Sequence, residues 1–155
     1  MAAQEDTPDE IWESLGDINI VDHDGETHLH YAARAGSATE VDNLIRHGAD
    51  ANVKNKSGQT PLHLAVQNYS GHRRSSHFRA RSDFVSLLLD SGADVNALTQ
   101  KGFNPTHIAL KKGSVPLLKM LLTWEADFRI PFPNGETLVF HTCSQGSASL
   151  LQVLL

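Results

Sequence analysis

The fold is decided by the stretch Gly58-Gln59-Thr60-Pro61-Leu62-His63-Leu64-Ala65, which is typical of a tight turn followed by a helix. Thr60 is a favourable N-cap, and Pro61 suits the first helical position, where its missing N–H would be unpaired in any case. Gly58 can adopt the positive φ angle of such a turn. Leu62 and Ala65 share one helical face, and this face needs a neighbouring helix to bury it.

Related copies of this stretch begin at Gly25, Gly102 and Gly135. The first copy begins 33 residues before Gly58, and the last begins 33 residues after Gly102. Only the interval from Gly58 to Gly102 differs, at 44 residues, which is one period plus eleven residues. A regular period of this length is the signature of a repeat protein.

A second motif repeats with the same spacing. It reads Leu44-Ile45-Arg46-His47-Gly48-Ala49-Asp50-Ala51-Asn52, and it recurs at Leu88–Asn96 and more weakly at Leu121–Arg129. Together, the 33-residue period and the Thr-Pro-Leu-His-x-Ala core resemble the ankyrin repeat, from about Asp17 to the end of the chain. The resemblance implies an all-α ankyrin-repeat solenoid, in which stacked antiparallel helix pairs are joined by β-hairpin-like loops.

The motifs also divide the chain. We expect residues 1–6 to be disordered and residues 7–19 to form an N-terminal capping half-repeat, because Thr7-Pro8-Asp9-Glu10 has the pattern of a capping box. The repeat array follows over residues 20–155. Its expected units are 20–51, 53–96, 97–128 and an incomplete 131–155, of which we expect the last to be the least stable.

The extra residues of the second unit form an insertion around 69–83, between its paired helices. The insertion contains four Arg, two His and one Asp, so its formal charge is +3 and that of the remaining residues is −8. One interpretation is a solvated, disordered loop, and the other is a basic docking loop for an acidic surface or a phosphate. Ser76 and Ser82 follow Arg-rich runs that resemble basophilic kinase sites, so both are candidate modification sites.

Composition limits the class of protein further. The 155 residues carry a formal net charge of −5, which argues against binding to nucleic acid. The single cysteine cannot form an internal disulfide, the N-terminus is acidic, and no apolar run approaches the length of a membrane span. We therefore expect a cytoplasmic or nuclear protein that does not bind membranes. We also expect a monomer, unless the open C-terminal end associates.

The nine histidines suggest a metal site, but their spacing favours a structural role. His30, His63 and His107 occupy one position of the repeat, where the family's imidazole hydrogen-bonds within and between repeats. One residue per stacked unit cannot converge on one ion, so we expect no metal and no cofactor. Cys143 corresponds to Ala33, Val66 and Leu110, which predicts a buried structural thiol rather than a nucleophile.

Departures from the repeat pattern occur in the third unit. Asn104 replaces the capping Thr and should still cap the helix, whereas Thr106 replaces a core Leu and should weaken the core locally. Asn52 and Asn96 also match the substrate pattern of the intracellular asparaginyl hydroxylase, because an acidic residue lies two positions before each and a Leu eight before. The competing interpretation is that each Asn stabilises a turn by local side-chain bonds.

The ankyrin resemblance implies that function lies at the exposed positions that vary between copies, on the hairpin tips and the concave side of the first helices. Phe103 is our candidate hot spot, since an exposed aromatic residue is otherwise unexplained. These positions change from mixed or acidic to basic along the chain, which favours an acidic protein partner. The candidate partner-binding residues are His23, Asp24, Glu26, Arg34, Lys56, Ser57, Gln59, Gln67, Gln100, Lys101, Phe103, Lys111 and Lys112.

No phosphate-binding loop, nucleophile motif or carboxylate pair is present in the sequence. The sequence therefore predicts a non-catalytic protein–protein interaction module of a scaffold, adaptor or inhibitor. Two alternatives remain open. In the first, the chain is the targeting domain of a longer regulatory enzyme. In the second, it is a substrate of asparaginyl hydroxylase at Asn52 and Asn96.

Overall fold

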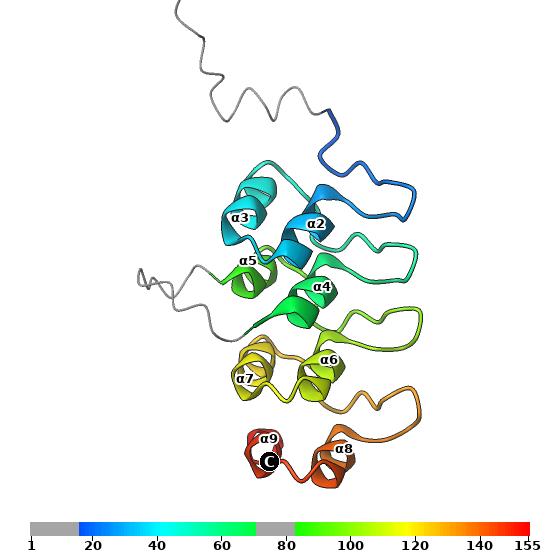
Figure 1. Ribbon diagram of the computed structural model, residues 1–155, viewed down its shortest axis with the longest axis vertical. Helices are drawn as coiled ribbons and strands as arrows, with labels where there is room; N and C mark the ends of the chain where they lie inside the picture. Colours follow the sequence, from blue (N-terminus) through cyan, green and yellow to red (C-terminus); the bar gives the residue numbers. More distant parts are fainter. Residues whose placement is uncertain (1–15, 71–82) are drawn as a thin grey trace, which may run out of the picture.

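The computed structural model describes residues 16–70 and 83–155 as a single row of stacked helix pairs (Figure 1). The expected capping helix after Thr7 and residues 71–82 of the insertion lie outside the described residues. No residue of 16–70 or 83–155 belongs to a strand, so the predicted all-α fold is confirmed. The helices of the described chain are α2 (His28–Ala35), α3 (Ala38–Arg46), α4 (Pro61–Asn68), α5 (Phe84–Asp90), α6 (Pro105–Lys111), α7 (Val115–Thr123), α8 (Leu138–Ser144) and α9 (Ala148–Leu154).

Each repeat consists of a first helix (α2, α4, α6 or α8) and a second helix (α3, α5, α7 or α9). The first helices form one column and the second helices form another, and the long loops project from the column of first helices (Figure 1). Each of these loops closes by a backbone hydrogen bond across five residues. We refer to residues 22–26, 55–59, 99–103 and 132–136 as the hairpin loops.

The start of each first helix follows from its capping residue. Thr60 is the N-cap of α4 and Pro61 is its first residue, as predicted. The Thr60 N–H donates to Nδ1 of His63 at 3.1 Å, so the cap is closed from both sides. Asn104 caps α6 in the same way, since its side chain accepts from the His107 N–H at 2.8 Å and its own N–H donates to His107 Nδ1.

The same histidines connect successive repeats. Because Nδ1 accepts a backbone N–H, Nε2 must carry the proton of the neutral ring and donate it to a carbonyl of the next repeat. Nε2 of His30 donates to Gln59 O at 3.0 Å, and Nε2 of His63 donates to Phe103 O at 3.2 Å. His107 donates to the carbonyl of Ile130 at 3.0 Å. The predicted hydrogen bonding within and between repeats is therefore confirmed.

Asparagines also connect the repeats. Nδ2 of Asn52 donates to Gly92 O at 3.0 Å, and its Oδ1 accepts from the Asp94 N–H at 2.7 Å. Asn19 and Asn96 occupy the same position in their own units and also accept a backbone N–H from the following unit. The Asn side chain thus joins two repeats, whereas the sequence suggested only local turn bonds.

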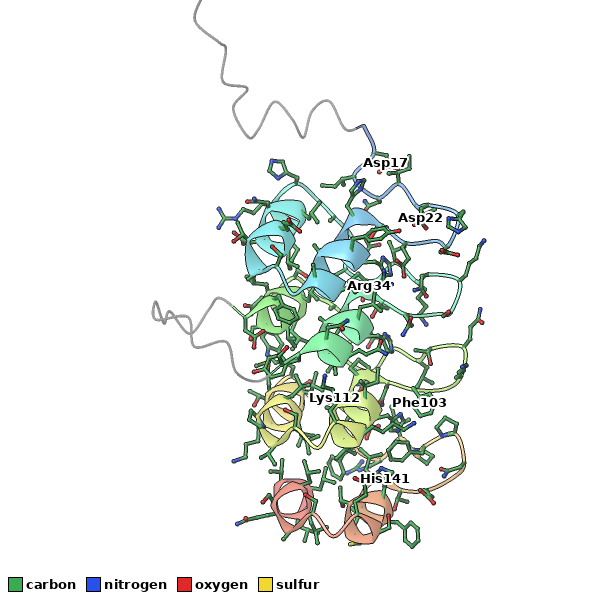
Figure 2. The ribbon with its side chains drawn as sticks, viewed as in Figure 1. Asp17, Asp22, Arg34, Phe103, Lys112 and His141 are labelled. Carbon is green, nitrogen blue, oxygen red and sulfur yellow. The ribbon has the colours of Figure 1, made fainter. Side chains whose placement is uncertain are left out.

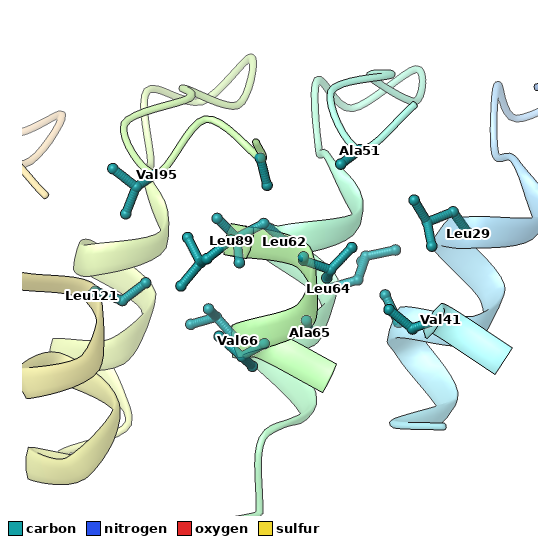
Figure 3. Close-up of a cluster of buried hydrophobic side chains, with 14 of the residues drawn as sticks. Leu29, Val41, Ala51, Leu62, Leu64, Ala65, Val66, Leu89, Val95 and Leu121 are labelled. Carbon is teal, nitrogen blue, oxygen red and sulfur yellow. The ribbon is translucent and has the colours of Figure 1, made fainter. Parts of the chain in front are cut away.

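The hydrophobic core runs through the stack between the two columns of helices (Figure 3). Leu62, Leu88 and Leu117 are completely buried, and the buried alanines at 33, 65 and 109 allow neighbouring helices to approach closely. A second, smaller cluster around Leu118 and Leu138 joins α8 and α9 to the rest. The core is therefore built at the contacts between repeats.

Two core positions differ from the simple repeat pattern. Thr106 is fully buried, and its hydroxyl has no hydrogen-bond partner. The prediction that Cys143 is buried was wrong, because its thiol is exposed. Residues at this position face the next repeat, as the buried Leu110 does toward α8, and no further helix pair of the described chain packs against α8.

The contact between the third and fourth repeats lacks one link that the other contacts have. The Lys56 N–H donates to Asp24 O at 2.9 Å, and the Gln100 N–H donates to Ser57 O at 3.0 Å, so neighbouring hairpin loops are bonded tip to tip. Pro133 occupies the equivalent position in the fourth repeat and has no N–H to donate. Instead, the ring of Phe132 packs there, with its centroid 4.4 Å from that of His107.

Replacing Thr106 with valine should raise the free energy of unfolding by about 1 kcal/mol, because valine has the same shape without the unpaired hydroxyl. Urea denaturation measures the difference. Thr142 is the matched control, since its equally buried hydroxyl donates to Val139 O at 2.8 Å. Thr142→Val should give no such gain, and equal effects of the two substitutions would contradict the prediction.

The array should become less stable as the pH falls from about 7.5 to about 5.5. Burial lowers the pKa of His30, His63 and His107 below the ordinary 6.5, so the unfolded chain binds protons first and unfolding is favoured below that value. Each histidine should contribute to this loss in the same direction. Urea denaturation at several pH values in this range measures the loss of stability.

A His63→Gln variant gives the control for this pH dependence. It should reduce the pH slope without abolishing it, since two of the three buried imidazoles remain. Burial raises the pKa of Asp83, which therefore stabilises the fold as the pH falls and acts in the opposite direction. An unchanged slope in the variant would assign the effect to groups other than these histidines.

Candidate protein-binding surface

The candidate residues lie along the hairpin loops and the exposed side of the first helices, and the structure arranges them by repeat (Figure 2). Among these candidate residues, two positions of each repeat lie closest to the first helix. One is the residue after the loop glycine, and the other is the residue seven positions after the N-cap. In the first repeat these are Glu26 and Arg34, and in the third repeat they are Phe103 and Lys111. In both repeats the two side chains touch each other.

In the first repeat, the charges neutralise one another. Nη1 of Arg34 donates to Oε2 of Glu26 at 2.8 Å, and its second guanidinium nitrogen donates to Oε1. Nδ2 of Asn55, from the next hairpin loop, donates to the same carboxylate at 3.1 Å. The hydrogen bonds from Arg34 lower the pKa of Glu26, which keeps the carboxylate ionised.

Glu26 is only 8% exposed and offers almost no surface to a partner, so we leave it out of the proposed surface. His23 and Asp24 are exposed at the tip of the first hairpin loop and pair with each other at 3.0 Å. Beside them, Asp22 accepts from the hydroxyl of Tyr31, and this bond contributes most to lowering the pKa of Asp22 to about 2.

The second repeat contributes polar but uncharged side chains around one cation. Lys56 and Ser57 are exposed at the tip of the hairpin loop, and Gln67 is exposed at the end of α4. Gln59 is half-buried, and its carbonyl accepts the bond from His30. These residues are accessible, but none of them forms a charged pair in the described chain.

The third repeat carries fixed positive charges. Nζ of Lys111 lies 4.1 Å from the centre of the Phe103 ring, and Nζ of Lys112 donates to Gln67 O at 2.6 Å. Gln100 and Lys101 are exposed at the tip of its hairpin loop. Across 16–70 and 83–155, neither Lys111 nor Lys112 has a carboxylate partner. This repeat therefore presents an open cationic surface.

Phe103 also belongs to the packing between repeats. Its side chain is half-buried, and its ring lies 6.5 Å from the ring of Phe132 in the following hairpin loop. Its carbonyl accepts the bond from His63. Sequence reasoning identified its exposed face but not this second role, which appears only when neighbouring hairpin loops are placed side by side.

The other candidate sites are separate from this surface. Both side-chain groups of Asn52 are bonded to the following repeat, so a modifying enzyme would have to release the side chain first. Asn96 accepts the Asp127 N–H in the same way. Ser76 and Ser82 lie outside the described residues.

Residues 16–70 and 83–155 contain no group of three or more His, Cys, Asp or Glu placed to hold a metal ion. None of the helices described is both long and apolar enough to cross a membrane.

The stacked helix pairs, their buried histidines and the variable outer side chains define a helical-repeat solenoid. A family model described as ankyrin repeats (3 copies) matches residues 1–75 and again 75–155. The chain belongs to the ankyrin repeat family, which confirms the resemblance found in its motifs.

Three relatives share part of the array. The NF-kappa-B inhibitor cactus of Drosophila melanogaster is 46% identical over 52 residues, which are 33% of this chain and 10% of cactus. The neurogenic locus notch homolog protein 1 of Homo sapiens is 40% identical over 67 residues, 41% of this chain and 3% of that protein. Its Xenopus laevis counterpart is 50% identical over 48 residues, 31% and 2% of the two chains. This chain thus spans a tenth or less of these three relatives.

Replacing Phe103 with alanine should lower the free energy of unfolding by about 2 kcal/mol, because a half-buried ring that packs between two repeats is lost. Lys111→Ala removes the cation from that ring and should change stability by less than about 1 kcal/mol. Urea denaturation of the two variants separates the roles. Similar effects would mean that the packing role of Phe103 is wrong.

Proposed function

We propose that the chain is a non-catalytic protein-interaction module, which binds an acidic segment of a partner protein. The proposed contact surface consists of the exposed residues of the hairpin loops 55–59 and 99–103 and the exposed side of α4 and α6. Membership of the ankyrin repeat family supports the general function. A relative named as an NF-kappa-B inhibitor is consistent with a module that acts by binding another protein.

The observation that carries the proposal is the pair Lys111 and Lys112. Both ammonium groups are held in place, one over the ring of Phe103 and one on the carbonyl of Gln67, yet neither is neutralised by a described carboxylate. Positioned cations lose little side-chain entropy when a carboxylate binds them. An acidic segment is therefore the partner that this surface fits best.

The alternative is a targeting domain of a longer regulatory enzyme. The same surface would then dock the enzyme on its target, and catalysis would be encoded elsewhere. Both functions require the same binding face. They differ in what the full reading frame encodes beside the array.

Reversing both charges should remove the partner from the array. Immobilised chain carrying Lys111→Glu and Lys112→Glu is compared with the unchanged chain by quantitative mass spectrometry of proteins captured from cell extract. Capture of the specific partner should fall by roughly tenfold or more, because each reversal replaces an attraction with a repulsion. It should also weaken with added salt.

Arg46→Glu is the matched control. Arg46 is an exposed cation of α3, in the column of second helices, and pairs only with Asp42 in the described chain, at 2.9 Å. The control should retain the partner and the fold, as judged by circular dichroism. Equal capture by the double variant and the unchanged chain would refute the proposed surface, and equal loss in both variants would show dependence on net charge alone.

A further inference from the structure

Arg34, Gln67 and Lys111 occupy the same place in three successive repeats, seven residues after the N-caps Thr27 and Thr60 and Asn104. They therefore form one column along the first helices. Figure 2 shows Arg34 on α2, and Lys112, next to Lys111, at the end of α6. From sequence alone, this column contains two cations separated by one neutral side chain.

The two cations have opposite surroundings. Arg34 is bonded through two nitrogens to Glu26, and the Glu26 carboxylate has a third bond from Asn55. At the position of Glu26, the third repeat has the uncharged Phe103, whose ring lies under Lys111. The charge of Arg34 is thus cancelled within the protein, whereas that of Lys111 is not.

Glu26 is well placed to neutralise the charge of Arg34. Its carboxylate is almost inaccessible to solvent, and its partners come from its own repeat and from the next hairpin loop. Asp22 lies close by, held by the hydroxyl of Tyr31 and by the N–H groups of Asp24 and Glu26. The charge of Arg34 is therefore compensated within the protein, although its side chain is 43% exposed.

We infer that Glu26 is a masking residue, which cancels Arg34 and thereby confines an acidic segment to the cations of repeats two and three. This inference rests on the proposed function and adds where on the array the acidic segment stops. The inference predicts that the column from Arg34 to Lys111 carries an uncompensated positive charge at both ends when Glu26 is replaced by an uncharged residue. Glu26 then acts through Arg34 as a determinant of specificity rather than as a contact residue.

Direct binding of a model acidic segment tests the mask. Adjacent helices pack about 10 Å apart, so the column from Arg34 to Lys111 spans about 20 Å. An extended peptide covers this in about six residues, and a fluorescein-labelled glutamate-rich peptide of about twelve residues leaves a margin at each end. Its affinity is measured by fluorescence anisotropy at low salt, with circular dichroism to verify the fold of each variant.

Glu26→Gln should bind the peptide roughly two- to fivefold more tightly than the unchanged chain, the gain expected from one exposed ion pair. Glutamine keeps the size and the hydrogen-bonding oxygen but not the charge. Asp24→Asn is the matched control, because it removes one carboxylate from the exposed tip of the same hairpin loop. It should produce a smaller change. Equal gains in the two variants would overturn the masking role.

Arg34→Gln completes the test by a double-mutant cycle. In the unchanged background it should weaken peptide binding, because it leaves the carboxylate of Glu26 without its cation. In the Glu26→Gln background it should abolish the gain. A folded double variant that keeps the tighter binding of Glu26→Gln would show that the gain does not come from Arg34.

The peptide-binding experiment distinguishes a failure of the proposed function from a failure of the masking inference. If the variant with both Lys111→Glu and Lys112→Glu binds the peptide as tightly as the unchanged chain, the acidic segment does not bind to repeats two and three. The proposed surface is then wrong. If that variant loses binding while Glu26→Gln gains nothing, only the masking inference is wrong.

Discussion

None of the helices in residues 16–70 and 83–155 is long enough to be stable without its neighbours. The helices contain seven to nine residues, and isolated helices of this length are not stable in water. Burial against the next pair therefore supplies the stability that each helix lacks. The polar links repeat with the same period, because buried histidines and turn asparagines each bond a backbone group of the following repeat. Packing and hydrogen bonding thus act across the same boundaries.

The period of the sequence was enough to predict this architecture. Capping residues such as Thr60 are local signals, and the histidine at the third helical position recurs in three units. What a side chain meets across a boundary was less predictable. Cys143 was assigned to a buried position by register, but register ensures burial only where another repeat follows. Asn52 was assigned local bonds, whereas its partners are forty and forty-two residues away in sequence.

The accessibility of the candidate surface residues was predicted with less precision, for a related reason. Variation between repeats identified the exposed positions, yet Glu26 is variable and buried, because its partner Arg34 varies with it. A pair of positions that changes together, from Glu and Arg to Phe and Lys, cannot be interpreted one residue at a time. The electrostatic character of the face depends on which charges are already paired. Counting lysines and arginines along the sequence does not provide that information.

Pro133 has a consequence for the shape of the array. Hairpin loops that are bonded tip to tip hold the angle between neighbouring repeats, as between Lys56 and Asp24. Where proline removes this bond, the last repeat is held by an aromatic contact, by the bond from His107 to Ile130 and by the apolar cluster around Leu118 and Leu138. Its hairpin loop is thus joined to the preceding loop by side-chain packing and not by a tip-to-tip backbone hydrogen bond. The angle between the third and fourth repeats is therefore set by side chains, whereas the angles between the first three repeats are also set by backbone groups.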